Sequence, residues 1–270
     1  MTETRFRTLH DRRFGYLDFG GEGPVLLALH GHFGRARQFA PLAAALAGRY
    51  RVLALDQRGH GLSDNGGAFT PAHYVADAAA FLEALDAAPA AVLGHSMGGI
   101  VATLLAARRP DLVRALLVAD IGMANHEPEV RPVLDVSAWP ARAASRDALD
   151  AAIGDSVSPA PGYFLDSAVE SGDGWRLLFD PADMMASQRA FDGAYWDEWA
   201  AGPQPALLMR GLDSFMLSAG TAARMAAARP GLRTVDFPGC GHWLDRDDPA
   251  AFADAVAAFL DGLPAPAARA

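Results

Sequence analysis

Short apolar runs, each followed at once by a polar residue or glycine, constrain the fold of this chain more than any other feature. The clearest run is Val25–Leu29, which is closed by His30 and Gly31. Continuous rather than alternating apolar residues are typical of strands that are buried on both faces of a mostly parallel sheet. Further runs of this kind are Val52–Leu55, Ala91–Leu93, Ala115–Ala119 and Ala206–Met209, and a last strand is predicted over Leu232–Phe237.

Helical patterns separate the predicted strands. Residues 72–85 follow the pair Thr70-Pro71, which favours the start of a helix, and residues 97–109 stop before Pro110. Two more helices are predicted over residues 36–47 and 250–260. Because strands and helices alternate, the sequence predicts an α/β fold with a mostly parallel central sheet flanked by helices.

This alternation lapses between residues 122 and 202. The segment contains six prolines and most of the large aromatic residues of the second half of the chain. We interpret it as an inserted helical lid, with residues 1–121 and 203–270 forming the core. The aromatic residues predict an apolar pocket, although tryptophans in a small insert more often form the insert's own core.

The overall composition limits the partners and the compartment. The net charge is −9, and the arginines are scattered rather than clustered, so nucleic acid is not an expected partner. No apolar run approaches the roughly 20 residues that cross a bilayer, and the first residues do not resemble a secretory signal. Cys240 is the single cysteine, which suits a reducing compartment, so the chain is expected to be cytoplasmic. No membrane partner is expected. Its oligomeric state is left open.

The segment Gly94-His95-Ser96-Met97-Gly98 carries the strongest chemical signal. It fits the Gly-x-Ser-x-Gly turn, with an apolar strand before it and a helix after it. Glycines at 94 and 98 allow strand and helix to approach closely, so that the serine hydroxyl lies at the helix amino terminus. A glycine-rich turn that only caps a helix is the alternative interpretation.

Along nearly its whole length the chain resembles the α/β-hydrolase family. Four motifs carry the resemblance, in family order: His30-Gly31-His32-Phe33, Asp56-Gln57-Arg58-Gly59-His60-Gly61-Leu62-Ser63, Gly94-His95-Ser96-Met97-Gly98-Gly99 and Gly239-Cys240-Gly241-His242. The resemblance implies that Ser96 is the nucleophile and His242 its general base.

The same resemblance implies roles for several neighbours. The backbone amides of His32 and Met97 correspond to the family's oxyanion hole. His30 and Gly31 support that loop, as Gly94 and Gly98 support the turn at Ser96. Arg58 is expected to tie loops together through hydrogen bonds rather than to join the reaction.

The acid that would orient His242 is not decided by the sequence. Asp213 follows the strand Ala206–Met209, but the usual family position for the acid is one residue later, at Ser214. Asp120 directly follows the strand Ala115–Ala119, a position that some similar subfamilies use. We favour Asp120 and keep Asp213 as the alternative.

These residues predict a serine hydrolase of the carboxylesterase type. A serine hydroxyl needs an imidazole to accept its proton and a carboxylate to hold that imidazole. The expected substrate is a carboxylic ester, thioester or lactone of a small, apolar molecule, cleaved through an acyl-enzyme without a cofactor or metal. The alternatives are a cofactor-free dioxygenase or perhydrolase of the same fold, and a small-molecule receptor with little turnover.

Overall fold

An eight-stranded sheet forms the centre of the computed structural model, which describes residues 2–46, 48–154 and 161–264. The strand order is β1-β2-β4-β3-β5-β6-β12-β13. The six strands from β4 to β13 in that order run parallel, and β1 and β2 add an antiparallel edge. Their bounds are β1 Arg5–Leu9, β2 Arg12–Asp18, β3 Val25–Leu29, β4 Arg51–Leu55, β5 Ala90–His95, β6 Val113–Ala119, β12 Ala206–Gly211 and β13 Arg233–Phe237.

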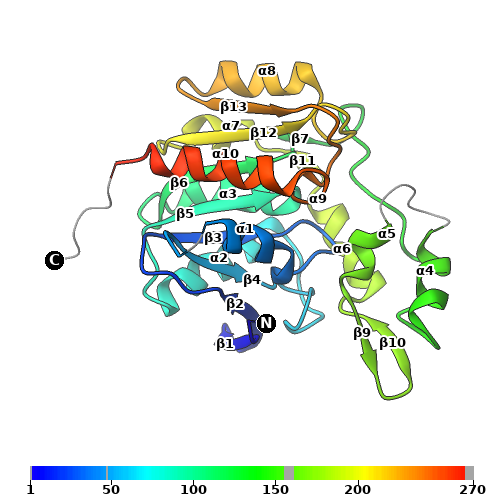
Figure 1. The fold of residues 1–270 in the computed structure, drawn as a ribbon. Coiled ribbons are helices and arrows are strands. Elements are labelled where there is room, and N and C mark those ends of the chain that lie inside the picture. The colour runs from blue at the N-terminus through cyan, green and yellow to red at the C-terminus, as the bar shows by residue number, and fades with distance from the viewer. Residues whose placement is uncertain (1, 47, 155–160, 265–270) are drawn as a thin grey trace.

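Helices cover both faces of this sheet, as predicted (Figure 1). Apolar side chains of one face pack against α2 Pro71–Ala84, α3 Met97–Arg108, α7 Trp196–Ala201 and α8 Ala219–Ala228. Side chains of the other face pack against η1 Ala36–Phe39, α1 Ala40–Ala45, α9 Leu244–Asp247 and α10 Pro249–Asp261. Successive residues of a strand point to opposite faces, so Leu26 and Leu27 of β3 belong to different core clusters.

The predicted strands and helices agree with the structure in type and differ slightly in bounds. The helix expected over residues 36–47 is a short 3-10 turn followed by α1, and its last residue lies outside the described ranges. The hairpin of β1 and β2 was not predicted, because it lies at the sheet edge and mixes arginines with apolar residues. No helix in the described ranges is long and apolar enough to cross a membrane.

The segment 122–202 is not purely helical, which differs from the prediction. It contains α4 Arg146–Gly154, α5 Pro161–Leu165 and α6 Pro181–Ala190, together with a small antiparallel sheet of order β8-β10-β9. The small sheet consists of β8 Arg142–Ala143, β9 Ala168–Ser171 and β10 Gly174–Leu177. Gly172 and Asp173 separate β9 from β10, and such a pair is typical of a two-residue hairpin turn. The hairpin was not predicted because the strands on either side are only four residues long.

The same segment divides between its own core and the main core. Trp139, Phe164 and Phe179 pack together in a separate cluster, as expected for an insert with its own interior. Trp199 of α7 instead belongs to the main core, and β7 Ala124–Asn125 pairs with β11 Gly193–Ala194 near the sheet. In Figure 1, α4, α5, β9 and β10 lie to one side of the sheet. We call residues 122–202 the cap segment from here on.

Candidate active site

Ser96 lies at a sharp turn between β5 and α3. Its φ of 52° and ψ of −124° are unusual for a residue other than glycine, which indicates backbone strain. A Cβ atom at Gly94 would overlap the carbonyl oxygen of Gly98, so the two chain segments can meet only if position 94 is glycine. The turn places Ser96 before the first residue of α3, Met97, whose amide has no acceptor within the helix.

His242 is held by a buried carboxylate. The Nδ1 atom of His242 donates a hydrogen bond to Oδ2 of Asp120 at 2.8 Å. Asp120 follows β6 directly and is fully buried. Its other oxygen, Oδ1, accepts a hydrogen bond from the amide of Gly211 at 3.0 Å. With Nδ1 as the donor, Nε2 is the ring atom left to accept a proton.

Asp213 does not lie in this arrangement. Its side chain is exposed, and its backbone amide donates a hydrogen bond to the carbonyl of Cys240 at 3.0 Å. The structure therefore brings Asp120, rather than Asp213, to His242.

Ser214 is a residue of the site that the sequence interpretation missed. Its hydroxyl donates to Oδ2 of Asp120, the same oxygen that accepts the hydrogen bond of His242. It also accepts a hydrogen bond from the amide of Met216 at 3.0 Å. The sequence does contain a signal for Ser214, because position 214 is the usual family position of the acid that orients the histidine.

His95 braces the loop of His242. Its Nε2 atom donates to the carbonyl oxygen of His242 at 2.8 Å, and the two ring centroids are 4.7 Å apart. Burial, assisted by the neighbouring His242, lowers the pKa of His95 to about 3. His95 therefore stays neutral at ordinary pH and serves as a fixed hydrogen-bond donor.

The loop of His30, Gly31 and His32 packs against the turn at Ser96. The amide of Gln57 donates to Nε2 of His30 at 3.0 Å, so the proton of that ring is on Nδ1, which donates to the carbonyl of Gly31 at 2.7 Å. Burial is the main cause that lowers the pKa of His30 well below its usual value, which keeps this arrangement at ordinary pH.

The hydrogen bond from His30 to the carbonyl of Gly31 sets the direction of the His32 amide. The amide of Gly34 also donates to the carbonyl of Gly31, at 3.2 Å. In a planar trans peptide the carbonyl and the next amide point in opposite directions, so the amide of His32 points away from these contacts. A Cβ atom on Gly31 would lie 3.0 Å from that of Ser96, which shows how closely the loop approaches the serine.

The side chain of His32 is anchored in a buried chain of polar groups. Its Nε2 lies 2.9 Å from Oγ of Ser187 in α6, and that oxygen lies 2.7 Å from the hydroxyl of Tyr74 in α2. Burial, followed by the nearby His60, lowers the pKa of His32 well below its usual value. The contact joins the core, the loop and the cap segment through neutral groups.

A cavity of about 570 Å³ connects these features. Ser96, Met97, His32 and His242 line it, so the predicted nucleophile, base and oxyanion loop face the same cavity. Most of the remaining lining is apolar, and much of it comes from the cap segment. Arg131 is the only arginine or lysine among the described lining residues.

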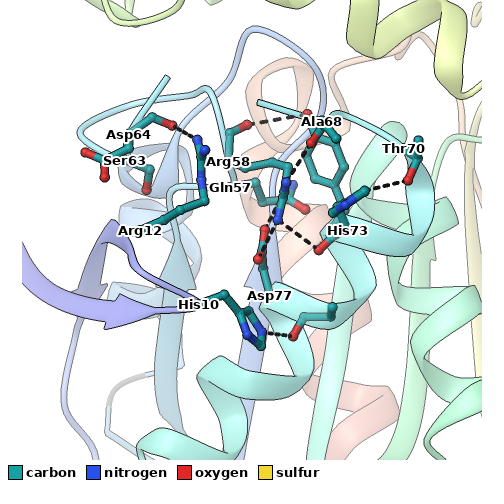
Figure 2. A network of polar contacts seen from close by, with 12 residues as sticks. His10, Arg12, Gln57, Arg58, Ser63, Asp64, Ala68, Thr70, His73 and Asp77 are labelled. Carbon is teal, nitrogen blue, oxygen red and sulfur yellow. Dashed lines mark hydrogen bonds and ion pairs between the residues drawn. The ribbon is translucent and has the colours of Figure 1, made fainter. Parts of the chain in front are cut away.

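The loop after β4 is structural, as the resemblance predicts for Arg58. Figure 2 shows Arg58 and Asp77 pointing toward one another from the loop and from α2. Two hydrogen bonds of 2.6 and 2.7 Å join the guanidinium and the carboxylate, and both side chains are buried. Arg58 also donates to the carbonyl of Ala68 at 2.6 Å. The pair fixes the loop without contributing to the lining of the cavity.

Within the ranges that the structure describes, no group of three or more histidine, cysteine, aspartate or glutamate residues is placed to hold a metal ion.

Comparison with known proteins places the chain among hydrolases. A sequence model for the group described as "Alpha/beta hydrolase family" matches residues 25–255. The chain is 30% identical over 249 residues to 2-(acetamidomethylene)succinate hydrolase of Mesorhizobium japonicum, covering 89% of each chain. It is 29% identical over 268 residues to the sn-1-specific diacylglycerol lipase ABHD11 of Mus musculus, covering 92% of this chain and 84% of that one.

Solved structures agree with this placement. The crystal structure of E-2-(acetamidomethylene)succinate hydrolase superposes with a TM-score of 0.87 at 26% identity, covering 97% of this chain and all of that chain. An alpha/beta hydrolase from Novosphingobium aromaticivorans superposes with a TM-score of 0.81 at 27% identity, covering 97% of this chain and 99% of that chain.

Proposed function

The chain belongs to the alpha/beta hydrolase family, and we propose that it hydrolyses a carboxylic ester, thioester or lactone of a small substrate through Ser96, His242 and Asp120. One observation carries this proposal. Nδ1 of His242 donates a 2.8 Å hydrogen bond to the buried Asp120, and His242 and Ser96 line the same cavity. The naming of its relatives as hydrolases supports a hydrolytic activity.

The reaction proceeds by two acyl transfers. Nε2 of His242 accepts the hydroxyl proton of Ser96 as Oγ attacks the substrate carbonyl, and the amides of His32 and Met97 stabilise the resulting oxyanion. His242 then returns that proton to the leaving alcohol or thiol, and the acyl group remains on Ser96. Water attacks the acyl-enzyme while His242 accepts its proton. The bond between the acyl group and Oγ then breaks, His242 returns the proton to Ser96, and the acid product leaves.

Asp120 keeps His242 in the required tautomer. Because the carboxylate accepts the proton on Nδ1, Nε2 is left as the acceptor that the first step needs. The amide of Gly211 and the hydroxyl of Ser214 also donate hydrogen bonds to Asp120. These bonds offset the free-energy cost of burying the carboxylate away from solvent.

We assign the cap segment the role of a lid. Phe164 of α5 and Phe191, which follows α6, line the cavity together with core residues such as Ile100. A cover of this kind excludes water from the reacting groups and strengthens the hydrogen bonds to the oxyanion.

Replacement of the nucleophile tests the proposed function. Ser96→Ala should lower kcat for 4-nitrophenyl butyrate by about a millionfold, because the acyl-enzyme can no longer form. The matched control is Ser145→Ala, which removes an exposed serine hydroxyl outside the cavity lining and should keep wild-type turnover. Wild-type turnover in the Ser96 variant would refute the proposal.

Arg131 favours a substrate that carries a carboxylate. It supplies a positive charge to a largely apolar cavity, and a relative with 30% identity is named for a succinate derivative. Asp135, which also lines the cavity, accepts hydrogen bonds through Oδ1 from the amide and hydroxyl of Ser137, at 3.0 and 2.6 Å. We propose that Arg131 pairs with the carboxylate of the substrate.

A pair of esters of similar size tests this preference. The 4-nitrophenyl monoester of glutaric acid should be hydrolysed with a higher kcat/KM than 4-nitrophenyl pentanoate, and Arg131→Gln should reduce that advantage by about tenfold. The control Arg146→Gln removes an exposed arginine of α4 outside the cavity lining and should preserve the ratio. Equal ratios in wild type and both variants would contradict the role of Arg131.

A further inference from the structure

Tyr163 reaches from the cap segment into the loop that carries His32. It belongs to α5, and its hydroxyl donates a hydrogen bond to the carbonyl oxygen of His32 at 2.9 Å. The side chain is buried, and its ring contacts those of Phe164, Trp243 and His95. The contact joins residues that are 131 positions apart in the sequence.

The loop is shaped around this hydroxyl. A Cβ atom at Gly34 would lie only 2.5 Å from the Tyr163 oxygen, and one at Gly31 would lie 3.2 Å from it. Any larger residue at position 34 would therefore have to displace the tyrosine or the loop. The absence of side chains at these glycines leaves the space that the hydroxyl occupies.

Hydrogen bonds restrain the peptide groups on both sides of His32. On one side, the carbonyl of Gly31 accepts from His30 and from the amide of Gly34. On the other side, the carbonyl of His32 accepts from Tyr163. The next residue, Phe33, has a φ of 68°, a strained conformation that the surrounding contacts must maintain.

We infer that Tyr163 is a positioning residue for the oxyanion hole, holding the amide of His32 in the direction that the reaction requires. The inference rests on the proposed function, because it concerns the oxyanion of that reaction. Since the hydroxyl belongs to the cap segment, the direction of the His32 amide depends on the docking of α5 on the loop.

The tyrosine hydroxyl remains a donor across the ordinary pH range. Burial, followed by the negative charge of Asp245, raises the pKa of Tyr163 well above its usual value. The contact with His32 is therefore not lost through ionisation of the phenol.

The test is Tyr163→Phe, which removes the hydroxyl and keeps the ring packing. We expect kcat for 4-nitrophenyl butyrate to fall about tenfold with KM unchanged, a smaller loss than complete removal of an oxyanion donor produces. The inhibition constant of a trifluoromethyl ketone, which forms a tetrahedral adduct with the serine, should rise by the same factor.

Tyr195→Phe is the matched control. The hydroxyl of Tyr195 also donates to a backbone carbonyl at 2.9 Å, that of Phe191, and Tyr195 is also buried. This variant should retain the wild-type kcat and inhibition constant, and circular dichroism should show both variants folded.

The outcomes separate the inference from the proposed function. A kcat and inhibition constant in Tyr163→Phe equal to those of wild type would overturn the inference alone, as would a change confined to KM. A wild-type protein that neither hydrolyses activated esters nor binds the ketone would overturn the proposed function, and the inference with it.

Discussion

Asp120 and Asp213 both follow strands of the central sheet, yet their surroundings differ sharply. Asp120 is fully buried and accepts hydrogen bonds from His242, Ser214 and the amide of Gly211. Asp213 is exposed, two residues beyond the end of β12. A buried carboxylate without such partners would be costly, so the contacts and the burial of Asp120 belong together.

Substitution of each aspartate tests this difference. Asp120→Asn should lower kcat by about 10⁴-fold, because the amide no longer favours the tautomer of His242 that can accept the serine proton. Asp213→Asn should leave kcat unchanged, since its side chain lies outside the arrangement. The check is steady-state hydrolysis of 4-nitrophenyl butyrate, and the reverse ranking in folded protein would assign the role to Asp213.

Individual residues of the candidate site differ in how far the sequence predicts them. Ser96 and His242 lie in local motifs, so their neighbours in the chain are informative. The contact of Asp120 with His242 spans 122 positions, and that of Tyr163 with His32 spans 131. Contacts of this range depend on how strands and cap pack, which no local pattern encodes.

At the scale of elements, burial decides which ones the sequence predicts. Strands such as β3 and β5 are buried on both faces and therefore read as continuous apolar runs. The edge strand β1 is largely exposed, and the strands of the cap segment are two to four residues long. These lack the length or the apolar pattern that distinguishes a strand from a loop.

The junction between the loop after β4 and α2 offers a test of element packing. Asp77→Ala would leave the guanidinium of Arg58 buried without its carboxylate partner, which should lower the free energy of unfolding by about 3–5 kcal/mol. The side chains of this pair are 5% and 2% exposed. Urea denaturation of the purified protein measures the change.

An exposed ion pair provides the control for that measurement. Arg142 and Asp173 lie 3.1 Å apart, with side chains 62% and 78% exposed. Asp173→Ala should change the free energy of unfolding by less than about 1 kcal/mol, because solvent screens the pair. An equally small effect of Asp77→Ala would contradict the structural role assigned to Arg58.

For the whole molecule, the sequence predicts the class of fold better than the shape of the cavity. The alternation of strands and helices places Ser96, Asp120 and the loop of His242 at the same edge of the sheet. The cavity also depends on cap residues such as Arg131, whose approach to that edge is a matter of tertiary packing. Family membership thus accounts for the reaction class, while the cap segment bears on the choice of substrate.

Covalent labelling identifies the nucleophile directly, and we expect it to be Ser96. After incubation with a fluorophosphonate, intact-mass measurement and peptide mapping should find one adduct per chain, located on Ser96 and absent from Ser96→Ala. An adduct on another residue at wild-type yield, or none on Ser96 in a protein that hydrolyses esters, would contradict the role of Ser96 as nucleophile.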